Sequence, residues 1–308
     1  MMKVVIGAGN GFLGSRLAEH LVGKGAEVTI LTRTPGKGEL WDGKSLGPWA
    51  ATLEDADLLV NLAGRSVNCR YTPENKAEIY ASRLDSTRVL GEAIAACKRP
   101  PRVWMNSSTA TIYRHAEDRP MDEATGEYGE GFSVDVAQKW EQVFYESPTP
   151  NTRKIALRSA IVMGAGEGLA FDHFLKLTKI GLGGRQGSGN QMVSWVHITD
   201  WLRAIDWIYG HPELNGSINI SAPNPVKNSR FMGELRKAVG ISFGIPLPVW
   251  MLEIGTYFMR TETELVLKSR WVLPNRLNES GFQFKFPTWP EAAKDLLKHP
   301  ATGNPSEP

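Results

Sequence analysis

The sequence predicts an α/β protein in which a doubly wound parallel sheet is followed by a small α/β lobe. Short runs rich in Val, Ile and Leu alternate with stretches of helical periodicity through the first half of the chain, as expected for strands buried on both faces. The first run is followed at once by a glycine-rich turn that opens a helix. Beyond residue 166 the pattern breaks into glycine-, proline- and aromatic-rich pieces, which indicates the second lobe.

Residues 3–33 are the unit on which the rest of the prediction depends. Residues 3–6 form a short apolar, β-branched run, which predicts a buried strand, and the turn at residues 7–14 follows directly. Gly25 stands where a helix should end, and residues 28–31 predict a second strand. The apolar face of the helix between them is formed by Leu13, Leu17, Leu21 and Val22.

A bound dinucleotide would explain the glycines in the turn. A pyrophosphate must approach main-chain N–H groups at a helix N-terminus, and a side chain at Gly9 or Gly11 would block it. Gly14 lets the helix pack closely against the strand. Because this G-x-G-x-x-G pattern follows a strand and opens a helix, it predicts a Rossmann-type site, with Gly7, Gly9 and Gly11 at the cofactor. The alternative is a plain glycine turn in another α/β unit.

The end of the second predicted strand favours NADP over NAD. An NAD site usually carries an acidic residue about 20 residues after the glycines, where it binds the ribose hydroxyls. The corresponding residue here is Arg33, and no carboxylate stands beside it. A guanidinium binds a 2′-phosphate through charge-assisted hydrogen bonds. The alternative is that Arg33 is a solvated loop charge.

Two later strands end in small or polar residues. Residues 57–61 lead into Leu62, Ala63 and Gly64, and residues 102–106 lead into Ser107, Ser108 and Thr109. Ligands of such sheets bind outside the carboxyl ends of the strands, so both ends are candidate sites. The alternatives are a simple tight turn after the first strand and a hydrogen-bonded Ser/Thr turn after the second.

The remaining elements follow from periodicity and from the placement of glycine and proline. We expect a short strand at 39–41, helices at 74–97, 133–145, 169–180, 201–209 and 228–239, and strands at 154–158, 192–197 and 219–220. Asp200 is expected to cap the helix at 201–209. The expected domains are residues 1–165 for the cofactor, residues 166–298 for lobe elements interleaved with the last core elements, with a small domain from about 225, and a disordered tail at 299–308.

Composition limits the class of protein. The 308 residues suffice for one large domain with an appended piece, and a net charge of +2 gives no argument for nucleic acid or a membrane surface as a partner. Cys69 and Cys97 have no metal or redox spacing, the histidines form no metal motif, and no signal peptide is evident. The apolar stretch at 241–259 contains two prolines and Glu253, so we expect a buried or surface-packed helix there rather than a membrane span, in a cytoplasmic protein.

These features together resemble the extended short-chain dehydrogenase/reductase family. More specifically, the chain is similar to an atypical NADP-binding subfamily of sugar-nucleotide epimerase-like proteins, with its own small C-terminal domain and largely undefined substrates. The resemblance covers residues 3–297. It is carried by the segments GFLG (11–14), NLAG (61–64), SRL (82–84), GLGG (181–184), GSG (187–189), SWVHI (194–198), APNP (222–225) and GFQF (281–284).

The resemblance implies a set of cofactor contacts. Gly9, Asn10, Gly11, Phe12 and Leu13 should touch the pyrophosphate, Arg33 the 2′-phosphate, Leu62 and Ala63 the adenine, and Arg83 the nicotinamide half. Gly64 and Ser107 belong to the same set. The turn departs from the family at one position, because Ala8 stands where the extended branch usually has glycine.

The resemblance also exposes a gap in the catalytic residues. Family members use a Ser or Thr that binds the substrate oxygen, and a Tyr, with a nearby Lys, as acid or base. Thr109 occupies the Ser/Thr position, but family spacing places Ser133 and Ala137 where Tyr and Lys should stand. Neither can replace the missing pair. Tyr113, four residues after Thr109, is the best candidate acid by position, and the alternative is that it packs as a wall of the cofactor pocket.

The substrate candidates are Arg158, Gln191 and Ser194, the last two in the stretch where extended relatives form their substrate pocket. For His197, with Asp200 three residues on, we expect a structural cap or pairing role. The sequence thus predicts an NADP(H)-binding oxidoreductase or epimerase-like enzyme acting on a small molecule, with a nucleotide-linked compound as one option. The alternative is a catalytically silent NADP(H)-binding redox sensor or interaction protein. The oligomeric state is left open.

Overall fold

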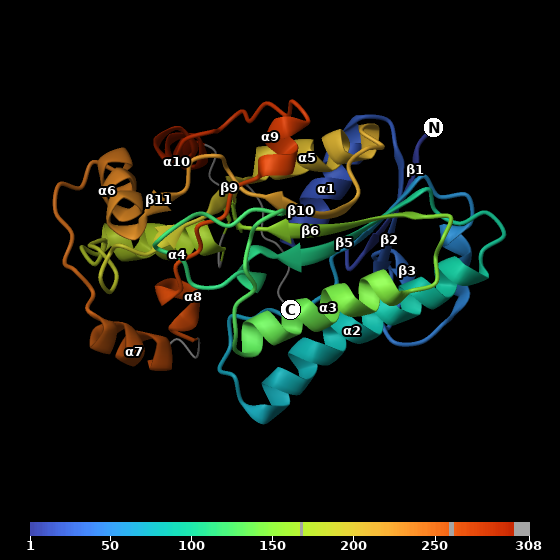
Figure 1. Ribbon diagram of the computed structural model, residues 1–308, viewed down its shortest axis with the longest axis horizontal. Helices are drawn as coiled ribbons and strands as arrows, with labels where there is room; N and C mark the ends of the chain where they lie inside the picture. The colour runs from blue at the N-terminus through green and yellow to red at the C-terminus, as the bar shows by residue number, and fades with distance from the viewer. Residues whose placement is uncertain (167–168, 259–261, 299–308) are drawn as a thin grey trace.

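A seven-stranded parallel sheet forms the centre of the molecule (Figure 1). The computed structural model describes residues 1–166, 169–258 and 262–298. The strand order is β10-β6-β5-β4-β1-β2-β3, so the chain starts in the middle of the sheet and winds outward in both directions, which confirms the predicted doubly wound fold. The strands are β1 (Lys3–Gly7), β2 (Glu27–Thr32), β3 (Glu39–Leu40), β4 (Leu58–Asn61), β5 (Val103–Thr109), β6 (Arg153–Ser159) and β10 (Gly216–Ile220).

Helices cover both faces of the sheet, as Figure 1 shows. Successive residues of β1 alternate between the faces: Val4 and Ile6 pack with one set of helices, whereas Val5 packs with the other. The first set is α1 (Phe12–Gly23), α5 (Ile198–Gly210) and α9 (Asn275–Glu279). The second set is α2 (Pro73–Ala96), α3 (Phe132–Glu146) and a 3₁₀ helix at Pro48–Leu53 that the sequence analysis did not predict.

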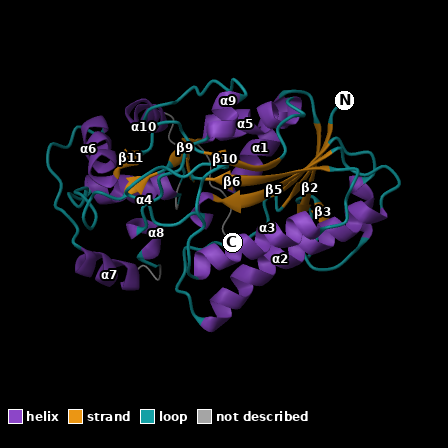
Figure 2. Cartoon of the chain, viewed as in Figure 1, coloured by secondary structure: helices purple, strands orange, loops and turns teal. Residues whose placement is uncertain are grey.

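The second lobe lies beside the sheet (Figure 2). It has its own core of buried aromatic side chains. Phe231 and Trp289 stack with ring centroids 4.1 Å apart, and Trp195 meets Trp289 edge-on at 5.2 Å. The helices of this lobe are α4 (Ala170–Lys179), α6 (Asn228–Ala238), α7 (Val249–Phe258), α8 (Glu264–Leu267) and α10 (Trp289–Lys298). Its strand pairs are β8 (Met192–Val193) with β11 (Val226–Lys227), antiparallel, and β7 (Ile161–Met163) with β9 (Trp195–His197), parallel.

The chain passes between sheet and lobe repeatedly. After α4 and β9 it returns to the main core through α5 and β10, leaves for α6 and α7, and returns again at α9. The domain limits themselves stay a prediction, and the tail at 299–308 lies outside the described residues. No helix within the described ranges has the length and apolar character needed to cross a bilayer. α7 is a ten-residue surface helix whose Trp250 is 61% exposed.

The expected cap at Asp200 is wrong. α5 begins at Ile198, and the residue that caps it is His197, whose Nδ1 accepts a hydrogen bond from Thr199 N at 3.1 Å. Asp200 instead lies fully buried in the first turn and accepts bonds of 2.8 Å from the backbone N–H groups of Lys285 and Phe286. Its carboxylate therefore ties the C-terminal segment to α5. Burial lowers the pKa of His197, which suits a neutral ring that accepts a hydrogen bond.

Candidate functional site

A cavity of about 200 Å³ lies at the carboxyl ends of β4 and β5. Parallel strands end at the same edge of the sheet, so the residues that follow neighbouring strands meet there. The cavity brings together six predicted site residues: Leu62, Ala63, Gly64, Arg83, Ser107 and Thr109. Further lining comes from Tyr71, Ile79, Thr111, Phe132, Ser133, Val136, Ala137 and Trp140, among others.

The glycine turn between β1 and α1 is shaped by close packing, with backbone at Gly14 and with side chains of the neighbouring strands at Gly9. A Cβ on Gly14 would lie 2.5 Å from Gly9 Cα, and a Cβ on Gly9 would lie 2.8 Å from Ile30 Cγ2. By contrast, a Cβ on Gly11 would meet only Ala8 O, at 4.0 Å. Gly9 and Gly14 are thus required by the fold itself, whereas the space beside Gly11 is open.

The start of α1 is available to an anion. Gly11 is the N-cap residue, and no side chain caps the helix there. The first N–H groups of a helix point outward and attract negative charge. Asn10 and Phe12 flank Gly11, and Leu13 begins the apolar face that packs against the core. This geometry fits the pyrophosphate of a dinucleotide.

Arg33 lies just beyond β2 and is exposed. Neighbouring Thr32 accepts a 2.5 Å hydrogen bond from Asn10 Nδ2, which ties the end of β2 to the glycine turn. Arg33 therefore follows directly on a residue in contact with the turn. Its role at a 2′-phosphate stays a prediction.

Arg83 reaches the cavity from α2. Its guanidinium donates to the backbone oxygen of Ile79 at 3.1 Å and lies 5.2 Å from the ring centroid of Trp140. A Cβ on Gly64 would lie 3.2 Å from Arg83 Cζ, so glycine permits the close approach of the two elements. Burial lowers the pKa of Arg83 to about 10, which leaves a cation in the cavity at neutral pH.

Thr109 stands at the end of β5 with its side chain at the cavity. Its Oγ1 accepts from Thr111 N at 3.1 Å and so caps the short 3₁₀ turn Ala110–Ile112. A hydroxyl that accepts in this way still has its own proton to donate. Thr109 can therefore offer a hydrogen bond to a ligand oxygen, while also forming the Ser/Thr turn that was the alternative interpretation.

Ser133 and Ala137, the positions at which Tyr and Lys are missing, both line the cavity from the first turns of α3. Ser133 Oγ donates to Glu264 Oε2 at 3.1 Å and lies 3.4 Å from the hydroxyl of Tyr71. The helix thus presents the expected face to Thr109, with a serine and a methyl group on it.

Tyr113 lies away from the cavity wall and is only 2% exposed. Its hydroxyl donates to Asn219 Oδ1 at 3.0 Å and accepts from Arg158 at 2.9 Å. Burial raises the pKa of Tyr113, so the phenol holds its proton more tightly than a free one. The structure does not bring this predicted acid to Thr109, and a catalytic role for it receives no support from the geometry.

The three substrate candidates also have partners within the fold. Arg158 forms a buried ion pair with Glu141, with contacts of 2.7 and 2.8 Å, and Glu141 holds the pKa of Arg158 above its ordinary value against the opposing effect of burial. Gln191 donates to Gln186 O at 2.8 Å. Ser194 donates to Arg270 O at 2.8 Å and anchors the passing segment. A substrate contact at these positions stays a prediction.

Sequence reasoning missed the residues that reach the site from far along the chain. Lys268 Nζ donates to Thr111 O at 2.8 Å, and Arg270 Nε donates to Thr111 Oγ1 at 3.1 Å. Burial, reinforced by the neighbouring charge of Arg270, lowers the pKa of Lys268 to about 8. More than 150 residues separate these side chains from Thr111, and no motif marks them.

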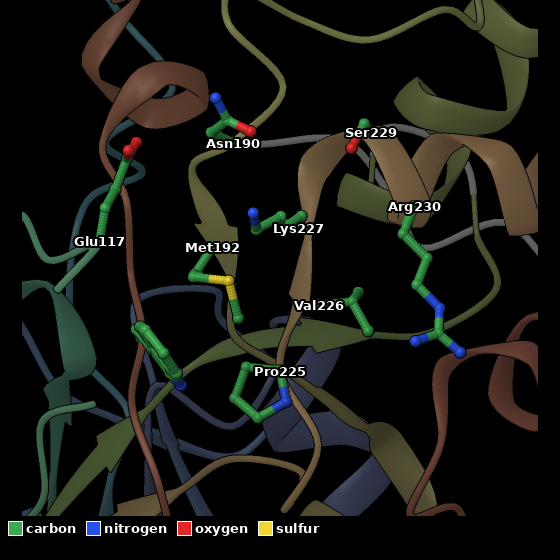
Figure 3. A pocket seen from close by; sticks show the side chains of 9 residues that line it. Glu117, Asn190, Met192, Pro225, Val226, Lys227, Ser229 and Arg230 are labelled. Carbon is green, nitrogen blue, oxygen red and sulfur yellow. The ribbon is translucent and has the colours of Figure 1, made fainter. Parts of the chain in front are cut away.

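A second, larger hollow of about 650 Å³ lies against the lobe (Figure 3). Figure 3 shows Glu117 on one side and Ser229 and Arg230 on the other, with Met192 and Lys227 between them. It contains none of the predicted site residues and does not include the glycine turn. Volume alone does not make it the site, because the polar groups predicted for cofactor chemistry gather in the smaller cavity. The described ranges contain no cluster of His, Cys, Asp and Glu suited to a metal ion.

Comparison with known proteins identifies relatives along the whole chain. A family model described as the NAD dependent epimerase/dehydratase family matches residues 4–221, and a domain of unknown function, DUF1731, matches residues 247–296. The human epimerase family protein SDR39U1 is 32% identical, over 96% of this chain and 100% of its own length. Epimerase family protein MW0731 of Staphylococcus aureus (strain MW2) is 29% identical, over 97% of this chain and 100% of its own.

Two solved structures also match this chain over 96% of its length. Human SDR39U1 (isoform 2), crystallised with NADPH, matches with a TM-score of 0.87 at 32% identity, covering 96% of this chain and 99% of that one. The nucleoside-diphosphate sugar epimerase from Corynebacterium glutamicum matches with a TM-score of 0.78 at 25% identity, covering 96% of this chain and 58% of that one.

Proposed function

The chain belongs to the NAD dependent epimerase/dehydratase family, and from this premise we propose that it is an NADP(H)-dependent enzyme that oxidises, reduces or epimerises a small molecule at the cavity beside Thr109. The observation that carries the proposal is the shared edge of the sheet. The open glycine turn and Thr109 lie at the carboxyl ends of β1 and β5, and Arg83 reaches the same edge from α2, where one extended dinucleotide can reach all three.

Each residue has a defined task in this proposal. The turn at Gly9 and Gly11 and the uncapped start of α1 bind the pyrophosphate. Arg33 binds the 2′-phosphate, with Asn10 holding the end of β2 in place. The human relative crystallised with NADPH supports this choice of cofactor.

When bound, NADP(H) supplies or accepts a hydride. Leu62, Ala63 and Gly64 give the cofactor an apolar wall, and Arg83 approaches its nicotinamide half across Gly64. Thr109 donates its hydroxyl proton in a hydrogen bond to the substrate oxygen, which positions the carbon bearing that oxygen for hydride transfer. The substrate is a small carbonyl or hydroxyl compound, and the sugar-nucleotide epimerase among the structural relatives favours a nucleotide-linked one.

The cofactor assignment is tested by titrating NADPH and NADH into the wild-type protein and into Arg33→Ala. We expect NADPH to bind at least ten times more tightly than NADH, because a charge-assisted bond to phosphate is worth about 1.5–3 kcal/mol. Arg33→Ala should remove that difference, whereas Arg16→Ala, a change in an exposed arginine on α1, should preserve it. Equal affinities for the two cofactors in the wild-type protein would contradict the proposal.

A catalytically silent NADP(H)-binding protein is the second candidate, favoured by Ser133 and Ala137 at the Tyr and Lys positions. The two candidates separate on turnover. Purified protein loaded with NADPH is mixed with aldehydes, α-diketones and nucleotide-linked ketosugars, and oxidation is followed at 340 nm. Oxidation that depends on one compound and falls in Thr109→Val supports the enzyme. Bound NADPH that no compound oxidises supports the silent protein.

A further inference from the structure

The family's catalytic tyrosine is missing from α3, but another tyrosine lines the same cavity. Tyr71 belongs to the loop just before α2 and is half-buried. Its hydroxyl lies 3.4 Å from Ser133 Oγ. Ser133 is the residue that stands at the missing tyrosine's position, so a phenol reaches that place from a different element, 62 residues away in sequence.

The loop around Tyr71 is held on several sides. Its backbone N–H donates to Glu262 Oε1 at 2.9 Å, and its ring meets Phe132 edge-on with centroids 4.7 Å apart. Thr72, the next residue, caps α2 by accepting from Asn75 N. These contacts fix the ring against the start of α3, which a group with a catalytic task requires.

The hydrogen bonds around Ser133 set the direction of the Tyr71 proton. Ser133 donates its own proton to Glu264, so its oxygen is left to accept from Tyr71. At 3.4 Å this second bond is long. The hydrogen bond from Tyr71 to Ser133 is therefore weak, and the Tyr71 hydroxyl can donate its proton to a ligand in the cavity instead.

A cation stands near the phenol. Arg83 lines the same cavity as Tyr71, and the charges of Arg83 and Arg270 favour its phenolate. Burial and, to a smaller extent, the carboxylates of Glu264 and Glu262 act in the opposite direction and raise the pKa of Tyr71. Within the described ranges Arg83 forms no ion pair with a carboxylate, and its guanidinium contacts Ile79 O and the Trp140 ring. A cation beside a phenol stabilises the phenolate that remains after proton transfer.

We propose that Tyr71 is the general acid of this enzyme, with Thr109 binding the substrate oxygen and Arg83 stabilising the phenolate. The inference rests on the proposed function. In the reducing direction, Tyr71 would give its phenolic proton to the C=O π electrons on oxygen, while bound NADPH would supply the hydride for the new C–H bond at the carbonyl carbon. The products are an alcohol, NADP⁺ and a phenolate, which regains its proton from solvent.

Two other candidates fit the cavity less well. Tyr113 gives its hydroxyl proton to Asn219 inside the protein. Lys268 donates to the backbone oxygen of Thr111, and it does not line the cavity. Burial raises the pKa of Tyr71, so its hydroxyl remains protonated through neutral pH, as an acid in the reducing direction must be.

Kinetics with the carbonyl panel test the assignment. For a compound that the wild-type protein reduces, Tyr71→Phe should lower kcat about 100-fold or more, the usual contribution of a positioned acid, with the KM for NADPH within about twofold. Tyr80→Phe is the matched control, because Tyr80 also packs on Phe132 but points to Asp135 on the surface; its kcat should stay within about twofold. A kcat in Tyr71→Phe equal to that of the control overturns the proposal.

A second measurement does not depend on turnover. Protein labelled at tyrosine ¹³Cζ is titrated with alkali while saturated with NADP⁺, and the Tyr71 resonance is assigned by its loss in Tyr71→Phe. We expect this resonance to shift when NADP⁺ is added, and its titration midpoint to rise in Arg83→Gln but not in Arg88→Gln, which changes an exposed arginine of α2.

These experiments distinguish failure of the proposed function from failure of the role assigned to Tyr71. Absence of NADPH binding sinks the proposed function. NADPH binding without oxidation by any compound contradicts enzymatic activity toward that panel. The ¹³Cζ resonance of Tyr71 then shows whether its phenol lies beside NADP⁺ and Arg83. A Tyr71 resonance that responds neither to NADP⁺ nor to Arg83→Gln overturns the inference, even where the proposed function stands.

Discussion

The glycine turn and the cavity beside Thr109 are neighbours in space, yet they are built in opposite ways. The turn is made by consecutive residues of one strand–turn–helix unit, and its shape depends on backbone contacts between Gly9 and Gly14. The cavity collects side chains from the loop before α2, from α2 itself, from the end of β5 and from α3. A local site is specified by a short stretch of sequence, whereas an assembled site is specified only by the completed fold.

The two regions also differ in what they hold. The turn carries small residues and a free helix start, so its affinity for phosphate comes from main-chain N–H groups. Charged groups that are partly removed from water lie in the cavity and behind its wall: Arg83 lines it, and Lys268 contacts Thr111, which lines it. Charges in such positions lower the free energy of unfolding, and they are found more often at binding and catalytic sites than elsewhere. Changes in the two regions should therefore have effects of different kinds.

The largest effect is expected in the turn, from Gly14→Ala. The added methyl group would lie 2.5–2.6 Å from Gly9 Cα, C and O, so the phosphate-binding backbone must move. We expect NADPH affinity to fall by about two orders of magnitude and the free energy of unfolding to fall by about 1–3 kcal/mol, the usual cost of overpacking. Fluorescence titration with NADPH and urea unfolding measure the two quantities.

Gly23→Ala is the control within the same helix. Nothing lies within 4 Å of a Cβ at Gly23, the last residue of α1. Alanine there should leave NADPH affinity unchanged and raise stability by at most about 1 kcal/mol, because glycine is a poor helix former. Equal NADPH affinity in the two variants would show that close packing at Gly14 does not shape the site.

A smaller effect is expected beside the cavity, from Lys268→Met, because Lys268 contacts Thr111 of the cavity wall. The pKa of Lys268 is lowered from 10.5 to about 8, because burial disfavours the charged amine. Below about pH 8 the amine is charged in both the folded and the unfolded state. In the folded state the charged amine is partly removed from water, which lowers the free energy of unfolding. Between about pH 8 and 10.5 the unfolded chain binds more protons, so the stability of the wild-type protein rises with pH.

Lys268→Met removes this dependence. The variant should be more stable than the wild-type protein at pH 7 by about 1 kcal/mol, a figure discounted because the side chain is still partly exposed to solvent. The difference should shrink as the pH rises from 8 to about 10.5. Urea unfolding at pH 7, 8.5 and 10 measures it. If the difference in the free energy of unfolding does not change with pH, the charge of Lys268 does not destabilise the folded state.

The fold was predictable because its determinants are local. Residues 3–6, the turn and the following helix combine a short apolar run, clustered glycines and helical spacing of apolar residues. Few structures other than a strand–turn–helix unit fit that combination. The brief strand at Glu39–Leu40 was found in the same way. The cap of α5 was not, because the buried Asp200 is held by Lys285 and Phe286, partners more than 80 residues away.

The site was predictable only in part, for the same reason. Leu62 and Gly64 follow β4, Thr109 is the last residue of β5, and strand ends can be located from sequence. Tyr113 was placed near Thr109 by sequence proximity, but the hydroxyl bond to Asn219, 106 residues away, turns its ring into the core. Tyr71 has no motif around it, and only the packing of its loop against Phe132 brings it to Ser133.

The smallest effect is expected from Ala8→Gly, which tests the one departure from the family pattern in the turn. Ala8 has φ of +57°, a left-handed conformation that costs a non-glycine residue about 1–2 kcal/mol. Part of this is offset because glycine makes the unfolded chain more flexible, so Ala8→Gly should raise the free energy of unfolding by about 0.5 kcal/mol. Ala18→Gly, in the middle of α1, should lower it by about 1 kcal/mol. If urea unfolding shows both variants to be destabilised alike, Ala8 is not strained, and the turn tolerates alanine without cost.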